Sequence, residues 1–193
     1  MVTPIAQRRT LIAASTATLV VLASPSSGQD PDKRFTDFAD TVVEYYDVPS
    51  TRERDIRRSL NELGPVSTTK NERFDALTAY NFRWRTRTKP DGNCDAQIDF
   101  TSTVTFPQLE NYAGLSRSAR RKWDAYILEL ERHEVGHLEI TYSVRPAVEI
   151  AFDGVSCETG RQRIKAALAQ LRDLHVQYDD LTDHGKRTGA TFP

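Results

Sequence analysis

Residues 123–144 read WDAYILELERHEVGHLEITYSV, and this stretch decides how the chain is expected to fold. Its apolar residues recur at steps of three and four, which is the period of an α-helix with one face turned toward a core. We therefore predict a long helix that begins at Ser116 or Ser118 and is kinked or ended by Pro146. The inward face comprises Trp123, Tyr126, Ile127, Leu130, Glu134, His137, Leu138, Thr141 and Val144.

Residues 133–137 of this helix form the pattern His-Glu-x-x-His. Positions i and i+4 of a helix lie on the same face, so the imidazoles of His133 and His137 can bind a single Zn²⁺. Glu134 is then close enough to act as general base on a water at the metal. We predict one zinc per chain, with His133 and His137 as ligands and Glu134 as the catalytic residue.

A third zinc ligand must come from another part of the chain, because catalytic zinc usually has three protein ligands. The remaining histidines are His175, on an apolar helical face, and His184, which follows a helix and precedes a glycine. We favour His184, because a histidine on an apolar face is more often packed in a core and ligands often converge from loops. His175, Glu149, Glu158 and Asp179 are the alternatives.

Two residues near His184 are candidates for supporting the site. Asp179 could orient a ligand histidine, or it could be a surface acid at the end of a helix. Tyr178 or Tyr142 could donate a hydrogen bond to a developing oxyanion, although each also suits a packing role.

The segments before the long helix predict strands. Residues 42–48 are rich in β-branched and aromatic residues, and residues 74–84 and 94–104 alternate apolar with polar side chains on either side of a turn at 89–93. Phe106-Pro107 is expected to end the sheet. A helix is predicted from Ser50 or Thr51 to Gly64-Pro65, and another over residues 157–178. We predict a single α+β domain at residues 35–189, with a small antiparallel sheet followed by packed helices.

Residues 1–28 have the layout of a secretory signal peptide. Arg8-Arg9 precede an apolar run at residues 11–23, and small residues follow. Cleavage after Ala23 or near Gly28 fits, the arginine pair permits twin-arginine export, and a retained N-terminal anchor is the alternative. We predict a periplasmic or extracellular protein with no membrane span after cleavage.

Two cysteines, Cys94 and Cys157, are present. In an exported protein an even count predicts a disulfide, whereas in the cytosol two buried thiols would be expected. The formal net charge of −1, with basic and acidic residues interspersed, argues against nucleic acid as a partner. The charge pattern does not indicate an oligomeric state.

The chain resembles the bacterial domain-of-unknown-function family 922, described as predicted secreted zinc-dependent proteases. The resemblance covers about residues 44–189, and it makes His184 the implied third ligand within a zincin-like H-E-x-x-H fold. A departure lies at residues 106–109, where members often carry Leu-Pro-x-Trp and this chain has Phe-Pro-Gln-Leu. The motifs that carry the resemblance are Tyr45-Tyr46-x-Val48, Gly64-Pro65, Trp84, Gly92-x-Cys94, Trp123, His133-Glu134-x-x-His137, Cys157 and Tyr178-Asp179-x-x-Thr182-x-His184-Gly185.

Two functions remain open at this point. The first is a secreted zinc-dependent metallopeptidase that cleaves amide bonds of a peptide or protein, or of a cell-wall polymer, with a zinc-activated water. The second is a periplasmic zinc-binding or structural protein without hydrolytic activity. The motif argues against a third class, an interaction domain that holds no metal.

Overall fold

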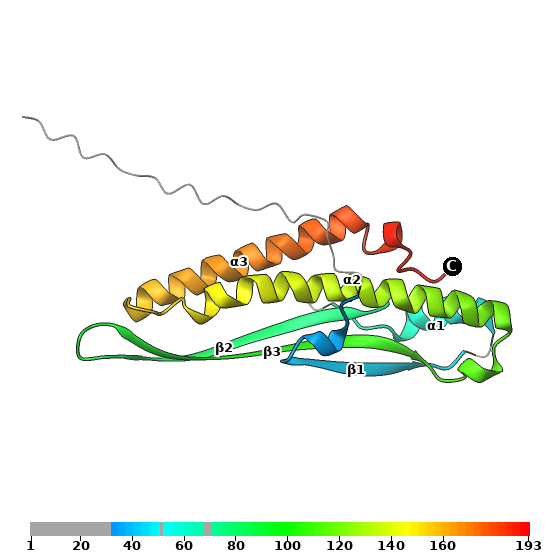
Figure 1. Ribbon diagram of the computed structural model, residues 1–193, viewed down its shortest axis with the longest axis horizontal. Helices are drawn as coiled ribbons and strands as arrows, with labels where there is room; N and C mark the ends of the chain where they lie inside the picture. The colour runs from blue at the N-terminus through cyan, green and yellow to red at the C-terminus, as the bar shows by residue number, and fades with distance from the viewer. Residues whose placement is uncertain (1–31, 51, 68–70) are drawn as a thin grey trace, which may run out of the picture.

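The computed structural model describes residues 32–50, 52–67 and 71–193 (Figure 1). The predicted signal peptide at residues 1–28 lies outside the described residues. The described residues form three strands and three α-helices, with short 3-10 helices at Phe35–Asp37, Tyr112–Gly114 and Lys186–Thr188. The larger elements are β1 (Thr41–Val48), α1 (Glu53–Leu63), β2 (Leu77–Thr88), β3 (Cys94–Leu109), α2 (Arg117–Glu149) and α3 (Cys157–Thr182).

The sheet has the strand order β1-β3-β2. β2 and β3 form the predicted antiparallel hairpin, in which Thr88 pairs with Cys94 next to the turn. β1 runs parallel to β3, from the pair Thr41–Ser102 to the pair Val48–Leu109. The α+β class is therefore confirmed, and the prediction of a fully antiparallel sheet is wrong for β1. β3 is the central strand, parallel to β1 on one side and antiparallel to β2 on the other.

The prediction that Phe106-Pro107 ends the sheet is also wrong, because β3 continues to Leu109. Pro107 pairs with Tyr46 of β1. β2 pairs with β3 only as far as Thr105, so β3 has a neighbour on one side where the proline stands. A proline that lacks an N–H is tolerated at such an edge position.

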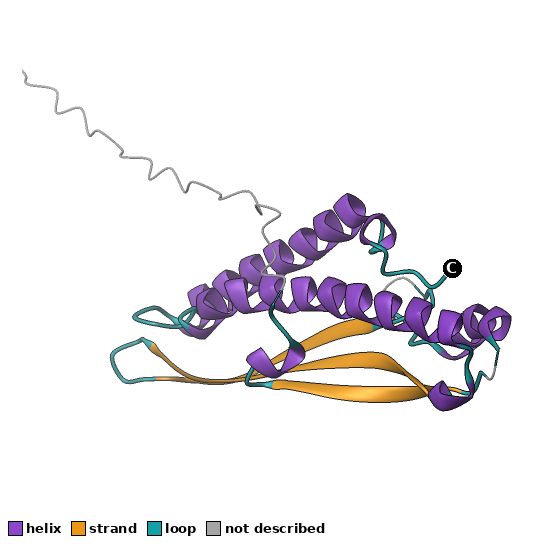
Figure 2. Cartoon of the chain, turned by 45° about the vertical axis from the view of Figure 1, so that its right-hand side comes forward, coloured by secondary structure: helices purple, strands orange, loops and turns teal. Residues whose placement is uncertain are grey.

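The predicted long helix is present as α2, which runs across one face of the sheet, and α3 lies against α2 (Figures 1 and 2). The hydroxyl oxygen of Ser116 caps α2 by accepting from the N–H of Ala119 at 3.2 Å, and Ser156 caps α3 in the same way. Pro146 lies in the last turn, and α2 ends three residues later at Glu149. α3 extends past the predicted end to Thr182.

Two apolar clusters make up the core of the described residues. One lies at the end of the molecule with α1 and β1 and includes Ile56, Leu60 and Leu138. The other lies near the tip of the hairpin and includes Val148 and Leu171. α2 passes through both, with Leu130, Val135 and Leu138 in the first cluster and Val144 and Val148 in the second.

A disulfide joins Cys94 at the start of β3 to Cys157 at the start of α3, as predicted. The backbone N–H of Cys94 also donates to the carbonyl oxygen of Val155 at 2.7 Å. Within the described ranges, no helix is both long enough and apolar enough to cross a bilayer.

The disulfide should contribute substantially to stability. It closes a loop with a sequence separation of 63 residues, and the chain-entropy model assigns such a loop about 4 kcal/mol. We expect a reductant to lower the urea midpoint of the oxidised protein by a corresponding amount. A Cys94→Ser/Cys157→Ser double variant should have the lower midpoint with or without reductant. Equal midpoints for the oxidised and reduced native protein would contradict this expectation.

Candidate metal centre

Three side chains from two helices converge between α2 and α3. His133 and His137 lie one turn apart on α2, and Asp179 lies on α3. The Nε2 atoms of His133 and His137 are 3.6 Å and 3.2 Å from Oδ1 of Asp179. One potential ligand atom from each residue lies within 4.8 Å of the other two. This group could hold a metal ion.

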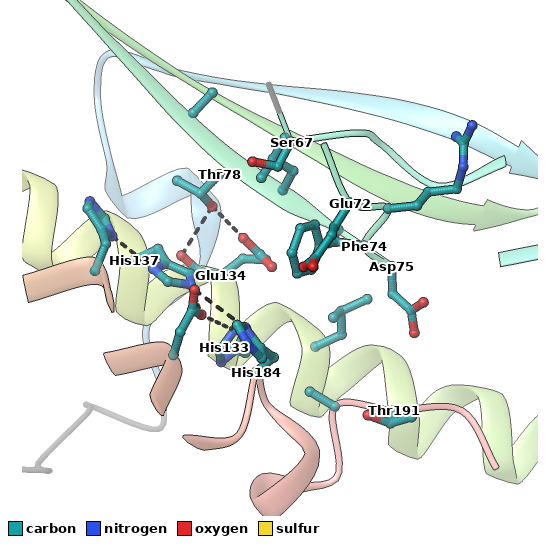
Figure 3. Close-up of a pocket in the computed structure, with 18 of the residues that line it drawn as sticks. Ser67, Glu72, Phe74, Asp75, Thr78, His133, Glu134, His137, His184 and Thr191 are labelled. Atoms are coloured by element: carbon teal, nitrogen blue, oxygen red, sulfur yellow. Dashed lines mark hydrogen bonds and ion pairs between the residues drawn. The ribbon is translucent and has the colours of Figure 1, made fainter. Parts of the chain in front are cut away.

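Glu134 is fixed beside this group by the sheet. Its side chain is 3% exposed. The hydroxyl of Thr78, on β2, donates to Oε2 of Glu134 at 2.7 Å, and Figure 3 shows this contact above His133 and His137. A buried carboxylate needs such a donor, because its charge is costly to bury without a partner. Glu134 is thus held in one orientation from the edge strand β2.

His184 approaches the group from a left-handed turn at the end of α3. Asp183, His184 and Gly185 have φ values of +49°, +50° and +79°. The N–H of His184 donates to the carbonyl oxygen of Asp179 at 2.9 Å, which closes the turn. The Nδ1 atom of His184 is 3.4 Å from Oδ2 of Asp179. His184, the predicted third ligand, therefore lies next to Asp179. It faces Oδ2 of this carboxylate, whereas His133 and His137 face Oδ1.

The left-handed turn also packs directly against His133. A Cβ atom added at Gly185 would lie 2.7 Å from Cβ of Ala190 and 3.2 Å from Cγ of His133. Only glycine fits this close approach with its positive φ. The turn that carries His184 therefore packs against the imidazole of His133.

His175 and Tyr178 contact the α2 histidines from α3. The ring of Tyr178 stacks on His133, with centroids 5.1 Å apart and planes at 18°, and its hydroxyl donates to the carbonyl oxygen of His133 at 3.3 Å. Nδ1 of His175 is 2.9 Å from Nδ1 of His137, on the side of that ring away from Asp179. Burial, together with the charge of His137, lowers the pKa of His175 to about 3, so this imidazole is neutral at physiological pH.

Asp179 is ionised in this setting. Burial raises its pKa, but hydrogen bonds from His133 and His137 and the charges of His137 and His184 outweigh burial and hold the pKa below its ordinary value. A carboxylate with its negative charge is the form that binds a cation.

The other candidate ligands are not brought to the group. Glu149 accepts from Nε of Arg145 at 2.6 Å at the end of α2. Glu158 accepts from Arg161 at 2.8 Å in the first turn of α3. Both carboxylates belong to surface ion pairs within their own helices.

The donor set fits a transition-metal ion. Imidazole nitrogens with one carboxylate oxygen are typical zinc ligands. The buried Nδ1 atoms of His133 and His184 have no hydrogen-bond partner among the described residues. For His184 this atom faces Asp179, so a cation between the two would satisfy both.

A scan against known families matches the chain over residues 43–185, from β1 to the turn that carries His184. The matching model is described as a bacterial protein of unknown function, DUF922. The chain belongs to the DUF922 family. No curated protein and no solved structure gives a significant match. The resemblance inferred from the sequence motifs is confirmed, and it supplies no activity.

The matched DUF922 segment includes His133, Glu134, His137, Asp179 and His184. These residues line a cavity of about 920 Å³, which is in the usual range for small-molecule and cofactor sites. Residues 77–80 of β2 line the same cavity, and so do the apolar side chains of Val66, Phe74 and Val176. A ligand in this cavity would lie between the edge strand and the candidate metal group.

Sequence reasoning missed the contacts made by Thr78 and Thr141 and the contact between His175 and His137. For Thr141 and His175, the helical spacing in the sequence could have indicated the contact. Thr141 follows His137 by four residues on α2, and His175 precedes Asp179 by four residues on α3, so each pair shares a helix face. No sequence pattern indicates the contact of Thr78 with Glu134, because that contact depends on how the sheet packs on α2.

Asp179 should be needed for metal binding. We expect Asp179→Asn to lower the affinity for Zn²⁺ by more than the roughly 10- to 100-fold that loss of an outer hydrogen bond costs. The matched control is Asp173→Asn on the same helix, because Asp173 is exposed and its carboxylate lies 3.7 Å from Nε of Arg172, away from the candidate group. Competition titration with a chromogenic chelator measures both variants. Equal affinities would remove Asp179 from the site.

Proposed function

We propose that this DUF922 protein is an exported zinc-dependent metallopeptidase that hydrolyses peptide or other amide bonds. His133, His137 and His184 would bind one zinc ion, together with the carboxylate of Asp179. The position of Glu134 carries the proposal: it is a buried carboxylate that Thr78 holds next to the group, on the wall of a cavity. A site that only stores zinc gains nothing from an oriented acid in that place.

Zinc at these donors would supply a Lewis acid and make water acidic enough to attack near neutral pH. Thr78 fixes Oε2 of Glu134, and we assign Oε1 as the atom that accepts the proton of the attacking water. The same carboxyl group would return that proton to the leaving amine. Because Glu134 is already oriented, the proton transfer does not carry the entropy cost of ordering a mobile side chain.

The proposed substrate is a peptide or protein, or an amide-bearing cell-wall polymer. The cavity beside the group is partly apolar and has room for part of a peptide chain. The disulfide supports an oxidising compartment such as the periplasm or the extracellular space, since disulfides persist there. In this proposal residues 1–28 are removed on export, and nucleic acid is not a partner.

The decisive variant is Glu134→Gln, which keeps the shape of the side chain but removes the base. We expect zinc content to be unchanged and turnover to fall by roughly 10²- to 10⁴-fold. The control is Glu131→Gln on the same helix, where the carboxylate lies 4.0 Å from Nε of Arg34. Cleavage is followed by mass spectrometry on a diverse peptide mixture and on cell-wall fragments.

Two outcomes would count against hydrolysis. If zinc-loaded native protein cleaves nothing in either mixture, a zinc-binding function without hydrolysis is favoured. If Glu134→Gln cleaves as fast as the native protein, Glu134 is not the base.

The proposed role of His184 has its own test. His184→Ala should lower zinc affinity more than His175→Ala. His184 is proposed to bind the ion directly, whereas His175 is proposed to contact the ligand His137 and not the ion. Isothermal titration of the two variants gives the order. The reverse order would assign the metal to His175 instead.

A further inference from the structure

His137 and His175 meet through the same atom of each ring, because the two Nδ1 atoms are 2.9 Å apart. A hydrogen bond between two nitrogens needs one proton, so one Nδ1 donates and the other accepts. The direction of this bond decides which nitrogen of His137 keeps its lone pair for a metal.

The contacts of Thr141 show which of the two histidines donates in this hydrogen bond. Its hydroxyl lies 2.9 Å from the carbonyl oxygen of His137, and a carbonyl oxygen can only accept, so Thr141 donates there. The same hydroxyl oxygen lies 3.2 Å from Nε2 of His175. Because its proton is already used, Thr141 accepts from His175, and the proton of neutral His175 is therefore on Nε2.

The remaining assignments follow in order. His175 with its proton on Nε2 has a bare Nδ1, which accepts from Nδ1–H of His137. This leaves Nε2 of His137, which is 3.2 Å from Oδ1 of Asp179, as the nitrogen that would bind a metal ion.

We propose that His175 and Thr141 are positioning residues, which fix His137 in the Nδ1–H tautomer and aim its Nε2 lone pair at the metal position. This inference rests on the metal-binding part of the proposed function. α3 contacts both nitrogens of one imidazole, with Asp179 at Nε2 and His175 at Nδ1. A hydrogen bond to the outer nitrogen of a ligand histidine fixes its orientation and raises its basicity as a ligand.

His175 is itself held in place by β2. Its ring stacks on Tyr80, with centroids 5.4 Å apart and planes at 13°. His133 provides a contrast within the same site, because its buried Nδ1 has no hydrogen-bond partner among the described residues. Its ring is instead held by stacking on Tyr178. The tautomer of His133 should therefore be insensitive to changes at His175.

The test begins with the metal-free protein at pH 8, labelled with ¹⁵N at histidine. Long-range ¹H–¹⁵N NMR should find the proton of His137 on Nδ1 and that of His175 on Nε2, with a scalar coupling across the bond between the two Nδ1 atoms. Adding Zn²⁺ should shift Nε2 of His137 and leave its Nδ1 protonated. A proton on Nε2 of His137 and another on Nδ1 of His175 would overturn the proposal. The tautomers of the metal-free protein are decided by this measurement whether or not the protein binds zinc.

Three variants then measure the effect on metal affinity. His175→Phe keeps a ring against Tyr80 but removes the acceptor, and we expect a loss of roughly 10- to 100-fold in zinc affinity. His175→Asn places an oxygen near the position of Nδ1 and should restore most of it. Thr141→Val should lower zinc affinity less than His175→Phe, because it removes the hydrogen bond to Nε2 of His175 but keeps the one between His175 and His137.

A purely structural role for His175 predicts a different pattern. In that case the zinc affinities of His175→Phe and His175→Asn would fall together and would follow the melting temperatures of the metal-free variants. Such a result would overturn the positioning role. Rescue by asparagine without a matching gain in melting temperature would support it.

Discussion

The carboxylate of Asp179 is the group on which the site depends. It faces two histidines of α2 with one oxygen and His184 with the other. Burying an ionised carboxylate costs several kcal/mol unless charges or hydrogen bonds compensate. The imidazoles supply that compensation, and in doing so they link α3 to α2.

The position of the site follows from the course of α2. This helix crosses both apolar clusters, and the segment that carries His133, Glu134 and His137 lies next to Leu138 of the first cluster. β2 closes this segment from the sheet side through Thr78 and Tyr80, and the left-handed turn at residues 183–185 closes it from the C-terminal side. The site is thus built from α2, α3, β2 and the turn after α3, which the chain brings together only in the folded state.

The parts of this arrangement that the sequence could predict are local. The spacing of His133 and His137 is set by the helical period, and the two cysteines were paired by their number and the expected compartment. The direction of β1 could not be predicted, because alternation of side chains is the same in parallel and antiparallel strands. The contact of His175 with His137 depends on the register between α2 and α3. An apolar helical face at His175 correctly indicated burial but said nothing about its partner.

The backbone at His184 has a consequence for the evolution of this chain. A side chain in the left-handed region costs about 1 to 2 kcal/mol relative to the right-handed helix, and glycine escapes most of that cost. Selection for folding alone would favour glycine at this position, as at the neighbouring Gly185. An imidazole held there against that preference marks a place where the molecule has given up stability to keep a particular chemical group within reach of its neighbours.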